Sequence, residues 1–152
     1  MLEIKQNQEL NKEKLLSFRG KIKQSDLESV GKEMESYIKS KGADRVGDPI
    51  TVTYAIEAGM IDVELLLQVN SIIPSSEKFV YKDCIKIVNA LVAVYKGNPI
   101  GLQDAVVQLN TFISEHKLQP ITVGYNVTKN VDLSNPDNTE VDVYVGINPN
   151  IL

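Results

Sequence analysis

The sequence predicts an α+β fold: a tandem pseudo-twofold repeat of strand-helix-strand-strand units. The first observation is a hexapeptide, PITVTY at 49–54, which returns at 120–125 as PITVGY with only one residue changed. The second is an apolar helical pattern before each copy, and the third is an apolar strand with acidic residues after each, IDVEL at 61–65 and VDVYV at 141–145. We therefore expect one antiparallel sheet with two helices on one face.

The two helical patterns have the same spacing, i, i+3, i+7, i+10 and i+11, which places all five side chains on one face of a helix. Their members are Leu27, Val30, Met34, Tyr37 and Ile38 in the first, and Leu102, Ala105, Leu109, Phe112 and Ile113 in the second. The first helix should run to about Lys41, with Gly42 in the left-handed conformation that ends many helices. The second, roughly 100–117, carries less charge, so we expect more of it to be buried or to touch a partner.

The expected strands span 14–22, 50–56, 61–69, part of 85–95, a segment opened by Pro120, and 140–147. Residues 1–14 form either a frayed tail or an edge strand. Alternation in the first hexapeptide places Val52 and Tyr54 on one face, which we expect to meet the helices, and Thr51 and Thr53 on the other. We expect a single domain over 1–152, with repeat one at about 14–70, a linker at about 71–84 and repeat two at about 85–148.

The bulk composition excludes several classes of protein. The net charge is −4 with a sequence pI near 5.0, which argues against a sequence-independent grip on nucleic acid. The single cysteine, Cys84, permits no internal disulfide and fits a reducing compartment. We see no membrane span and no secretory signal, so we expect a cytoplasmic protein. One histidine and one cysteine give no metal constellation, and we expect no cofactor.

The order of motifs resembles the bacterial effector-binding, gyrase-inhibitor-like (GyrI-like) domain family. The resemblance covers about 14–147 and rests on GDP at 47–49, DVE at 62–64, YKG at 95–97 and VDVY at 141–144. That family includes the ligand-sensing domains of multidrug-responsive transcription regulators, and the chain is also similar to small lone-domain proteins of Gram-positive bacteria. The chain departs from the family in having Gln68 and Gly146 where a proline is common, and in having no tryptophan.

The resemblance implies an acidic residue in a groove between the repeats, where it meets a cationic and often aromatic ligand through charge pairing and cation–π contact. Glu64 is our first candidate, because alternation places it on the open polar face. The repeat sets Tyr144 at the equivalent place in the other half, so the two would form a clamp. Glu140 is a second acidic candidate. A solvated sheet-face position is the competing interpretation for both carboxylates.

Four further aromatic residues are candidates with a structural alternative. Tyr54 and Tyr125 fall on the apolar side of the repeated hexapeptide, where core packing competes with ligand binding. Phe18 and Tyr95 precede the two helices and either wall the groove or pack in the core.

Three functional hypotheses remain open from the sequence. The first is a stand-alone, non-catalytic protein that binds a small organic molecule, possibly cationic, in the inter-repeat groove; with no room for a DNA-binding segment in the first fourteen residues, we expect no direct nucleic-acid contact. The second is a protein-interaction module, such as an accessory or immunity-type factor of a bacterial toxin or secretion system, with helix two as its surface. The third is a hydrolase that uses Glu64 with Tyr144. The sequence leaves the oligomeric state open.

Overall fold

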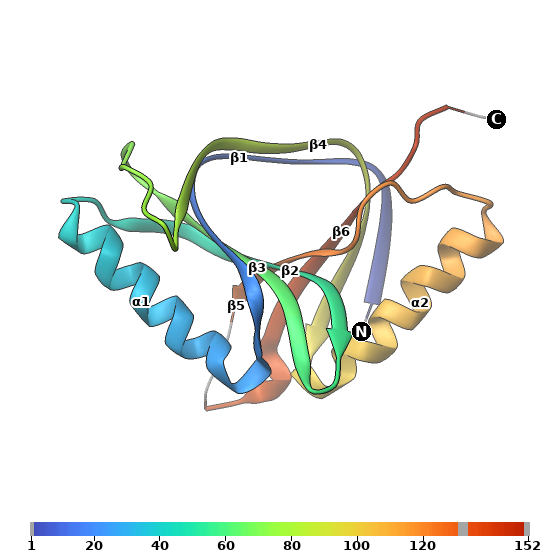
Figure 1. The fold of residues 1–152 in the computed structure, drawn as a ribbon. Coiled ribbons are helices and arrows are strands. Elements are labelled where there is room, and N and C mark those ends of the chain that lie inside the picture. Colours follow the sequence, from blue (N-terminus) through green and yellow to red (C-terminus); the bar gives the residue numbers. More distant parts are fainter. Residues whose placement is uncertain (1, 131–133, 151–152) are drawn as a thin grey trace. The chain divides into compact units, whose positions relative to one another are not determined.

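The computed structural model describes residues 2–130 and 134–150 (Figure 1). Its strands and helices are β1 (Leu2–Lys23), α1 (Leu27–Ser40), β2 (Arg45–Glu57), β3 (Met60–Val69), β4 (Val80–Gly97), α2 (Leu102–Glu115), β5 (Tyr125–Asn130) and β6 (Thr139–Gly146). A short 3₁₀ turn precedes each α-helix. The α+β class and the twofold strand-helix-strand-strand order are therefore confirmed.

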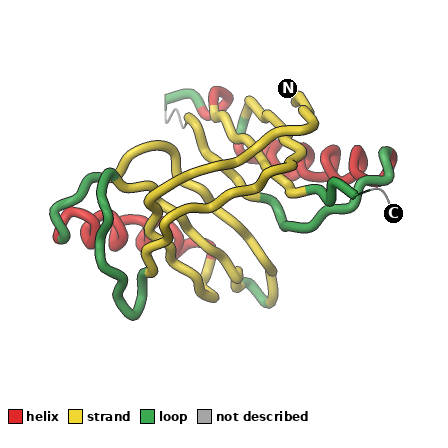
Figure 2. The backbone as a smooth tube through the Cα atoms, turned by 90° about the horizontal axis from the view of Figure 1, so that it is seen from above, coloured by secondary structure: helices red, strands yellow, loops and turns green. Residues whose placement is uncertain are grey.

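The chain forms two compact units. We call Asn11–Lys86 the first unit, and Met1–Leu10 together with Ile87–Leu152 the second unit. The long strands β1 and β4 contribute residues to both units, and Figure 2 shows how much of the chain is strand. Of the two alternatives for residues 1–14, the strand is confirmed from Leu2 onward. The linker predicted at 71–84 is shorter than expected, because β4 already begins at Val80.

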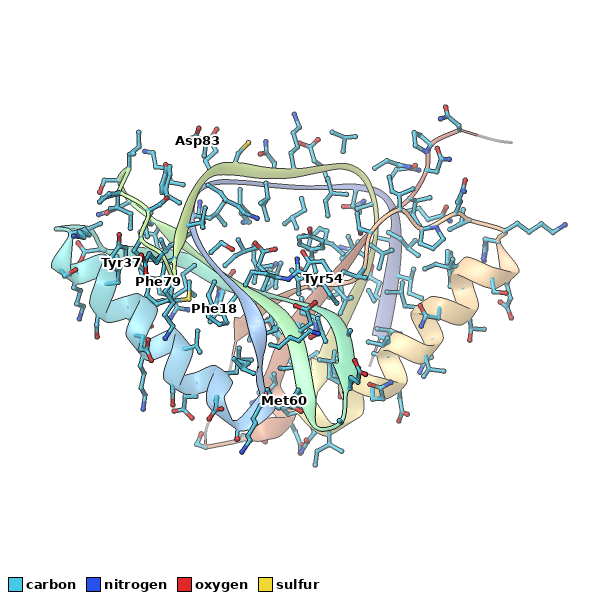
Figure 3. The ribbon with its side chains drawn as sticks, viewed as in Figure 1. Phe18, Tyr37, Tyr54, Met60, Phe79 and Asp83 are labelled. Carbon is cyan, nitrogen blue, oxygen red and sulfur yellow. The ribbon has the colours of Figure 1, made fainter. Side chains whose placement is uncertain are left out.

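In the first unit β3 is the central strand, paired antiparallel with β1 on one side and β2 on the other. One face of this sheet packs against α1, as its apolar pattern predicts. The buried members of that core include Val30, Met34 and Ile38 of α1 with Val63, Leu65 and Leu67 of β3. Figure 3 shows Phe18, Tyr37 and Phe79 beside α1, where the rings of Phe18 and Phe79 meet edge to face at 6.4 Å.

The second unit repeats this arrangement with β6 as the central strand between β4 and β5. Its core joins α2 to the face of β6 that carries Val141, Val143 and Val145. Leu109 and Ile113 are the buried α2 residues at the positions that Met34 and Ile38 hold in α1. The predicted helical faces are thus confirmed in both units. Among the described residues, no helix has the length and apolarity needed to cross a membrane.

Both α-helices end in the same hydrogen-bonded cap. In α1 the N–H of Gly42 donates to the Lys39 carbonyl and that of Ala43 to the Ile38 carbonyl. Gly42 has a φ of 76°, which confirms its predicted left-handed conformation. In α2 the N–H of Lys117 donates to Ser114 and that of Leu118 to Ile113. Lys117 therefore occupies the position of Gly42, with a φ of 52°.

The expected orientation of the hexapeptide strand is wrong. Val52 lies directly opposite Glu64, and Thr53 lies opposite Val63. Residues paired in this way share a face of the sheet. Since Val63 belongs to the α1 core, Thr53 faces the helix and Val52 faces away from it. The apolar alternation was read correctly, but Ile50 and Val52 are buried on the face turned away from α1, so hydrophobicity alone did not show which face of β2 meets the helix.

The two hexapeptide copies also do not form equivalent strands. The first lies inside β2, whereas β5 begins only at Tyr125, the last residue of the second copy. The preceding residues approach the end of β6 differently: the Ile121 N–H donates to the Gly146 carbonyl, and the Gly146 N–H donates to Thr122 Oγ1, both at 2.8 Å. A side-chain hydroxyl thus replaces the backbone acceptor that a continued strand would supply.

Candidate ligand-binding site

Glu64 lies at the centre of the first unit's sheet, on the face turned away from α1. Its neighbours across the sheet are Arg19 of β1 and Val52 of β2. The residue is only 5% exposed. The solvated position that we held as the alternative is therefore wrong for Glu64, because the carboxylate is buried.

Both oxygens of this carboxylate accept hydrogen bonds. The Tyr54 hydroxyl donates to Oε1 at 2.9 Å, while the Ser17 hydroxyl donates to Oε2 at 2.5 Å. The ammonium of Lys82 donates to Oε2 at 2.6 Å. The carboxylate is thus held by two hydroxyl groups and one charge, which meets the need of a buried anion for partners.

These contacts keep Glu64 ionised. Burial raises the pKa of the Glu64 carboxyl, but the hydrogen bonds from Lys82, Ser17 and Tyr54 outweigh it, and the pKa is lowered from its ordinary value. The site therefore presents a permanent negative charge at neutral pH.

A second cation lies beside this carboxylate. The guanidinium carbon of Arg19 is 3.6 Å from the centre of the Tyr54 ring, a cation–π contact. The same group donates to both oxygens of Asp62, from Nε at 3.0 Å and from Nη2 at 3.1 Å. The hydrogen bond with Arg19 lowers the pKa of Asp62. We call Glu64 with Ser17, Tyr54, Lys82 and Arg19 the acidic centre.

Tyr54 joins the acidic centre and not the helix-side core, so the core interpretation of this residue is wrong. The register shift between Thr53 and Ala55 in β2 accompanies this placement, since a bulge changes the direction of the side chains next to it. Figure 3 labels Tyr54 well apart from the Phe18–Phe79 cluster beside α1.

The second unit holds Tyr144 and Tyr125, which lie directly opposite each other on β6 and β5. Burial and the neighbouring Asp142 raise the pKa of the Tyr144 hydroxyl. Asp142 is itself buried, with Lys129 Nζ at 3.3 Å from Oδ2. The clamp that pairs Tyr144 with Glu64 joins two units and stays a prediction.

The remaining predicted residues lie elsewhere. Glu140 pairs with Lys96 at 3.6 Å, and both side chains are largely exposed. Phe18 is buried in the α1 core. Tyr95 is buried opposite Val141 on the helix side of β4, and its hydroxyl donates to the Asn98 carbonyl at 2.5 Å. The structure therefore does not bring Phe18 to Glu64.

Sequence reasoning missed three members of the acidic centre. Ser17 and Arg19 lie two residues apart on β1, and the same alternation that placed Glu64 could have grouped them. Lys82 had no such signal, because it was assigned to a linker and not to β4. Among the described residues, no group of three or more His, Cys, Asp or Glu side chains could hold a metal ion.

The fold is similar to that of several solved proteins. EcmrR, solved in a complex with DNA, superposes with a TM-score of 0.77 at 14% identity over 97% of this chain, which spans 57% of the EcmrR chain. A hydrolase from Listeria innocua gives 0.59 at 13% identity over 97% of this chain and 91% of the other. SAV2435, solved with tetraphenylphosphonium, gives 0.55 at 8% identity over 98% of this chain and 94% of the other.

At these identities the similarity shows a shared fold and nothing more. No protein-family model and no curated protein matches the chain. Membership in the gyrase-inhibitor-like family therefore stays a prediction.

Proposed function

We propose that this chain is a non-catalytic small-molecule-binding domain that holds an organic cation at Glu64. The observation that carries the proposal is a buried, ionised carboxylate in contact with an ammonium group, beside a ring face that already carries a guanidinium. Charge pairing at low solvent exposure and cation–π contact are the two interactions that select lipophilic cations.

Lys82 is the group that such a ligand would replace. Its side chain is 40% exposed, whereas that of Glu64 is 6% exposed, so the lysine reaches a buried anion from a wetter position. The flexible lysine stem allows its ammonium to move into solvent when another cation takes its place. Exchange of one cation for another keeps the carboxylate neutralised, and the ligand's apolar body adds burial that an ammonium cannot.

The same geometry argues against catalysis by Glu64. A general acid or base works best with a pKa near the operating pH. Here the pKa of Glu64 is lowered, and both carboxylate oxygens already accept hydrogen bonds. Glu64 is therefore suited to anchor a charge and poorly suited to transfer a proton. The hydrolase hypothesis finds no support in this site.

One structural neighbour supports a binding role, although another is a hydrolase. SAV2435 was solved with tetraphenylphosphonium, a lipophilic cation of the kind that this carboxylate and ring would hold. We carry over only the class of ligand, since the two chains share 8% identity.

The protein-partner alternative draws no specific support from α2. Its apolar side chains Ala105, Leu109 and Ile113 are buried, and Val107 is the large apolar residue of this helix that is most exposed. One exposed valine is ordinary for a surface helix and makes no docking patch.

The proposal is tested by thermal shift with tetraphenylphosphonium as the probe. Binding to the folded state raises the melting temperature by mass action, by about 5–10 °C at a hundredfold excess over the Kd. We expect this shift in the wild type and its loss in Glu64→Gln, which keeps the shape of the side chain and removes its charge.

The matched control is Asp142→Asn, which removes the buried carboxylate of the second unit. We expect its shift to equal that of the wild type. Equal shifts in the wild type and Glu64→Gln would remove Glu64 from the proposed site, and no shift in the wild type across a panel of lipophilic cations would refute the proposed ligand class.

A further inference from the structure

A cavity in the second unit is separate from the acidic centre. It has a volume of about 560 Å³, a size typical of sites for small organic molecules. Its walls come from the start of β1, the middle of β4, the turn after α2 and the segment after β6. The lining residues that matter below are Asn7, Asn89, His116, Lys117, Leu118 and Gln119. We infer that this cavity binds a small organic carboxylate with an apolar body.

The charges of the lining point to an anion. Among the residues that the structure describes, the lining includes Lys117 and His116 and no Asp or Glu, although the chain has a net charge of −4. His116 has one ring nitrogen committed, since Nδ1 lies 3.0 Å from the Phe112 carbonyl. A carboxylate would meet the ammonium of Lys117, whereas the described lining offers a cation no opposite charge.

The uncharged polar groups add free donors. Gln119 accepts from Asn148 Nδ2 through Oε1 at 2.7 Å, and within 2–130 and 134–150 no hydrogen bond of its amide N–H groups is seen, so they are candidate donors to a ligand. The Asn89 amide is a weaker candidate donor to a ligand, because its Nδ2 already donates to the Ile147 carbonyl at 3.0 Å. Ala90, Leu91, Leu118 and Ile147 supply apolar surface for the body of the ligand.

The backbone supplies an independent observation. Lys117 has a φ of 52° at the helix-end position where Gly42 stands in the first unit. A residue with a Cβ is disfavoured in that conformation, and such strain gathers at functional sites. Asn7, also in the lining, has a φ of 56°. Lys14 and Ala58, outside the lining, also have a positive φ, so the conformation of Lys117 supports a role in the cavity only together with its charge.

The carbonyls at the end of α2 do not exclude an anion. The helix end carries a partial negative charge when its carbonyls are free. Here the carbonyls of Phe112, Ile113 and Ser114 accept hydrogen bonds from the N–H groups of His116, Leu118 and Lys117. The cap thus reduces the repulsion that a carboxylate would meet.

Calorimetric titration of the full chain with three ligands of one shape tests this inference. The probes are 2-naphthoate, 2-naphthamide and 2-naphthylmethylammonium. We expect naphthoate to bind at least about tenfold more tightly than the amide, the effect of one charge-assisted contact, and the ammonium not to bind at this cavity. Equal affinity for naphthoate and the amide would overturn the anion assignment, as would no binding of naphthoate.

Two variants locate the site. Lys117→Gln keeps the side-chain length and removes the charge, and we expect it to weaken naphthoate binding by about fivefold or more. Lys39→Gln, an exposed lysine in the last turn of α1, is the matched control and should bind as the wild type does. Equal loss in both variants, or none in Lys117→Gln, would contradict the assignment.

The variant Lys117→Gly distinguishes a loss of ligand binding from a loss of folding. Glycine relieves the positive φ, so we expect the melting temperature to rise by about 2–4 °C while naphthoate binding falls. A variant that gains stability and loses the ligand cannot have lost it by unfolding. A stabilised variant with full naphthoate affinity would show that the lysine has no role in the cavity.

Discussion

Among the described residues, each unit buries one carboxylate on the face of its sheet that is turned away from its helix, but the two carboxylates are held differently. Glu64 accepts hydrogen bonds from Ser17, Tyr54 and Lys82. Asp142 has Lys129 at 3.3 Å, and its neighbour on the strand is Tyr144. The repeated scaffold therefore supports one elaborated acidic centre and one plain ion pair. The difference lies in the polar partners and not in the helix-side cores, which match.

The largest expected effects come from those cores and should be equal in the two units. Met34 and Leu109 are fully buried at equivalent helix positions. We expect Met34→Ala and Leu109→Ala each to lower the free energy of unfolding by about 2–4 kcal/mol, the cost of a buried cavity. Chemical denaturation measures both. A loss in one variant more than twice that in the other would break the equivalence of the cores.

Removal of the two buried carboxylates should lower the free energy of unfolding by different amounts. In Glu64→Gln the amide has no charge to pair with Lys82, and a hydroxyl of Ser17 or Tyr54 must turn from donor to acceptor to meet its NH₂ group. We expect a cost of about 2 kcal/mol for Glu64→Gln and about 1 kcal/mol for Asp142→Asn in denaturant titrations. Equal costs would mean that the three partners of Glu64 add nothing beyond one ion pair.

The contribution of Glu64 should also depend on pH. Its pKa is lowered in the folded state, so its stabilisation is full above the ordinary glutamate pKa of about 4.3 and disappears as the pH falls through the folded value. The melting temperatures of wild type and Glu64→Gln should thus differ most near neutral pH and converge below about pH 4. If the difference in melting temperature between the two proteins stays constant with pH, the charge of Glu64 is not its source.

The smallest effect concerns two tyrosines. Tyr54→Phe removes the hydroxyl that donates to Glu64 and keeps the ring below Arg19, so we expect a loss of about 1 kcal/mol. Tyr125→Phe should stay within about 0.5 kcal/mol, because no hydrogen bond of its hydroxyl is seen within the described chain. Thermal denaturation of both variants makes the comparison, and a larger loss for Tyr125→Phe would reverse it.

The sequence predicted the helices well because a 3.6-residue period lasts over several turns in each, and tertiary packing uses the face it marks. It failed at the sheet for a physical reason. Ile50 and Val52 of β2 are buried although they face away from α1, so burial on both faces of the sheet leaves the orientation of this strand undecided.

Part of the acidic centre was within reach of the sequence and part was not. Glu64 and Tyr54 were named as candidates, although Tyr54 was placed on the wrong face. Lys82 depends on a contact 18 residues along the chain, and no local pattern encodes such a contact. The same holds for Ser17, which is 47 residues from its carboxylate partner.

The most direct test of the central claim, that Lys82 holds the place of a bound cation, is the affinity of tetraphenylphosphonium for Lys82→Met. The substitution removes the internal competitor and leaves Glu64 uncompensated, so the free protein should be less stable while the ligand binds more tightly, by about tenfold. Lys129→Met in the second unit should leave the affinity unchanged. Isothermal titration calorimetry of the wild type, Lys82→Met and Lys129→Met measures the affinity of each for tetraphenylphosphonium. We predict tighter binding by Lys82→Met alone. Binding by Lys82→Met that equals or falls below that of the wild type would contradict the account.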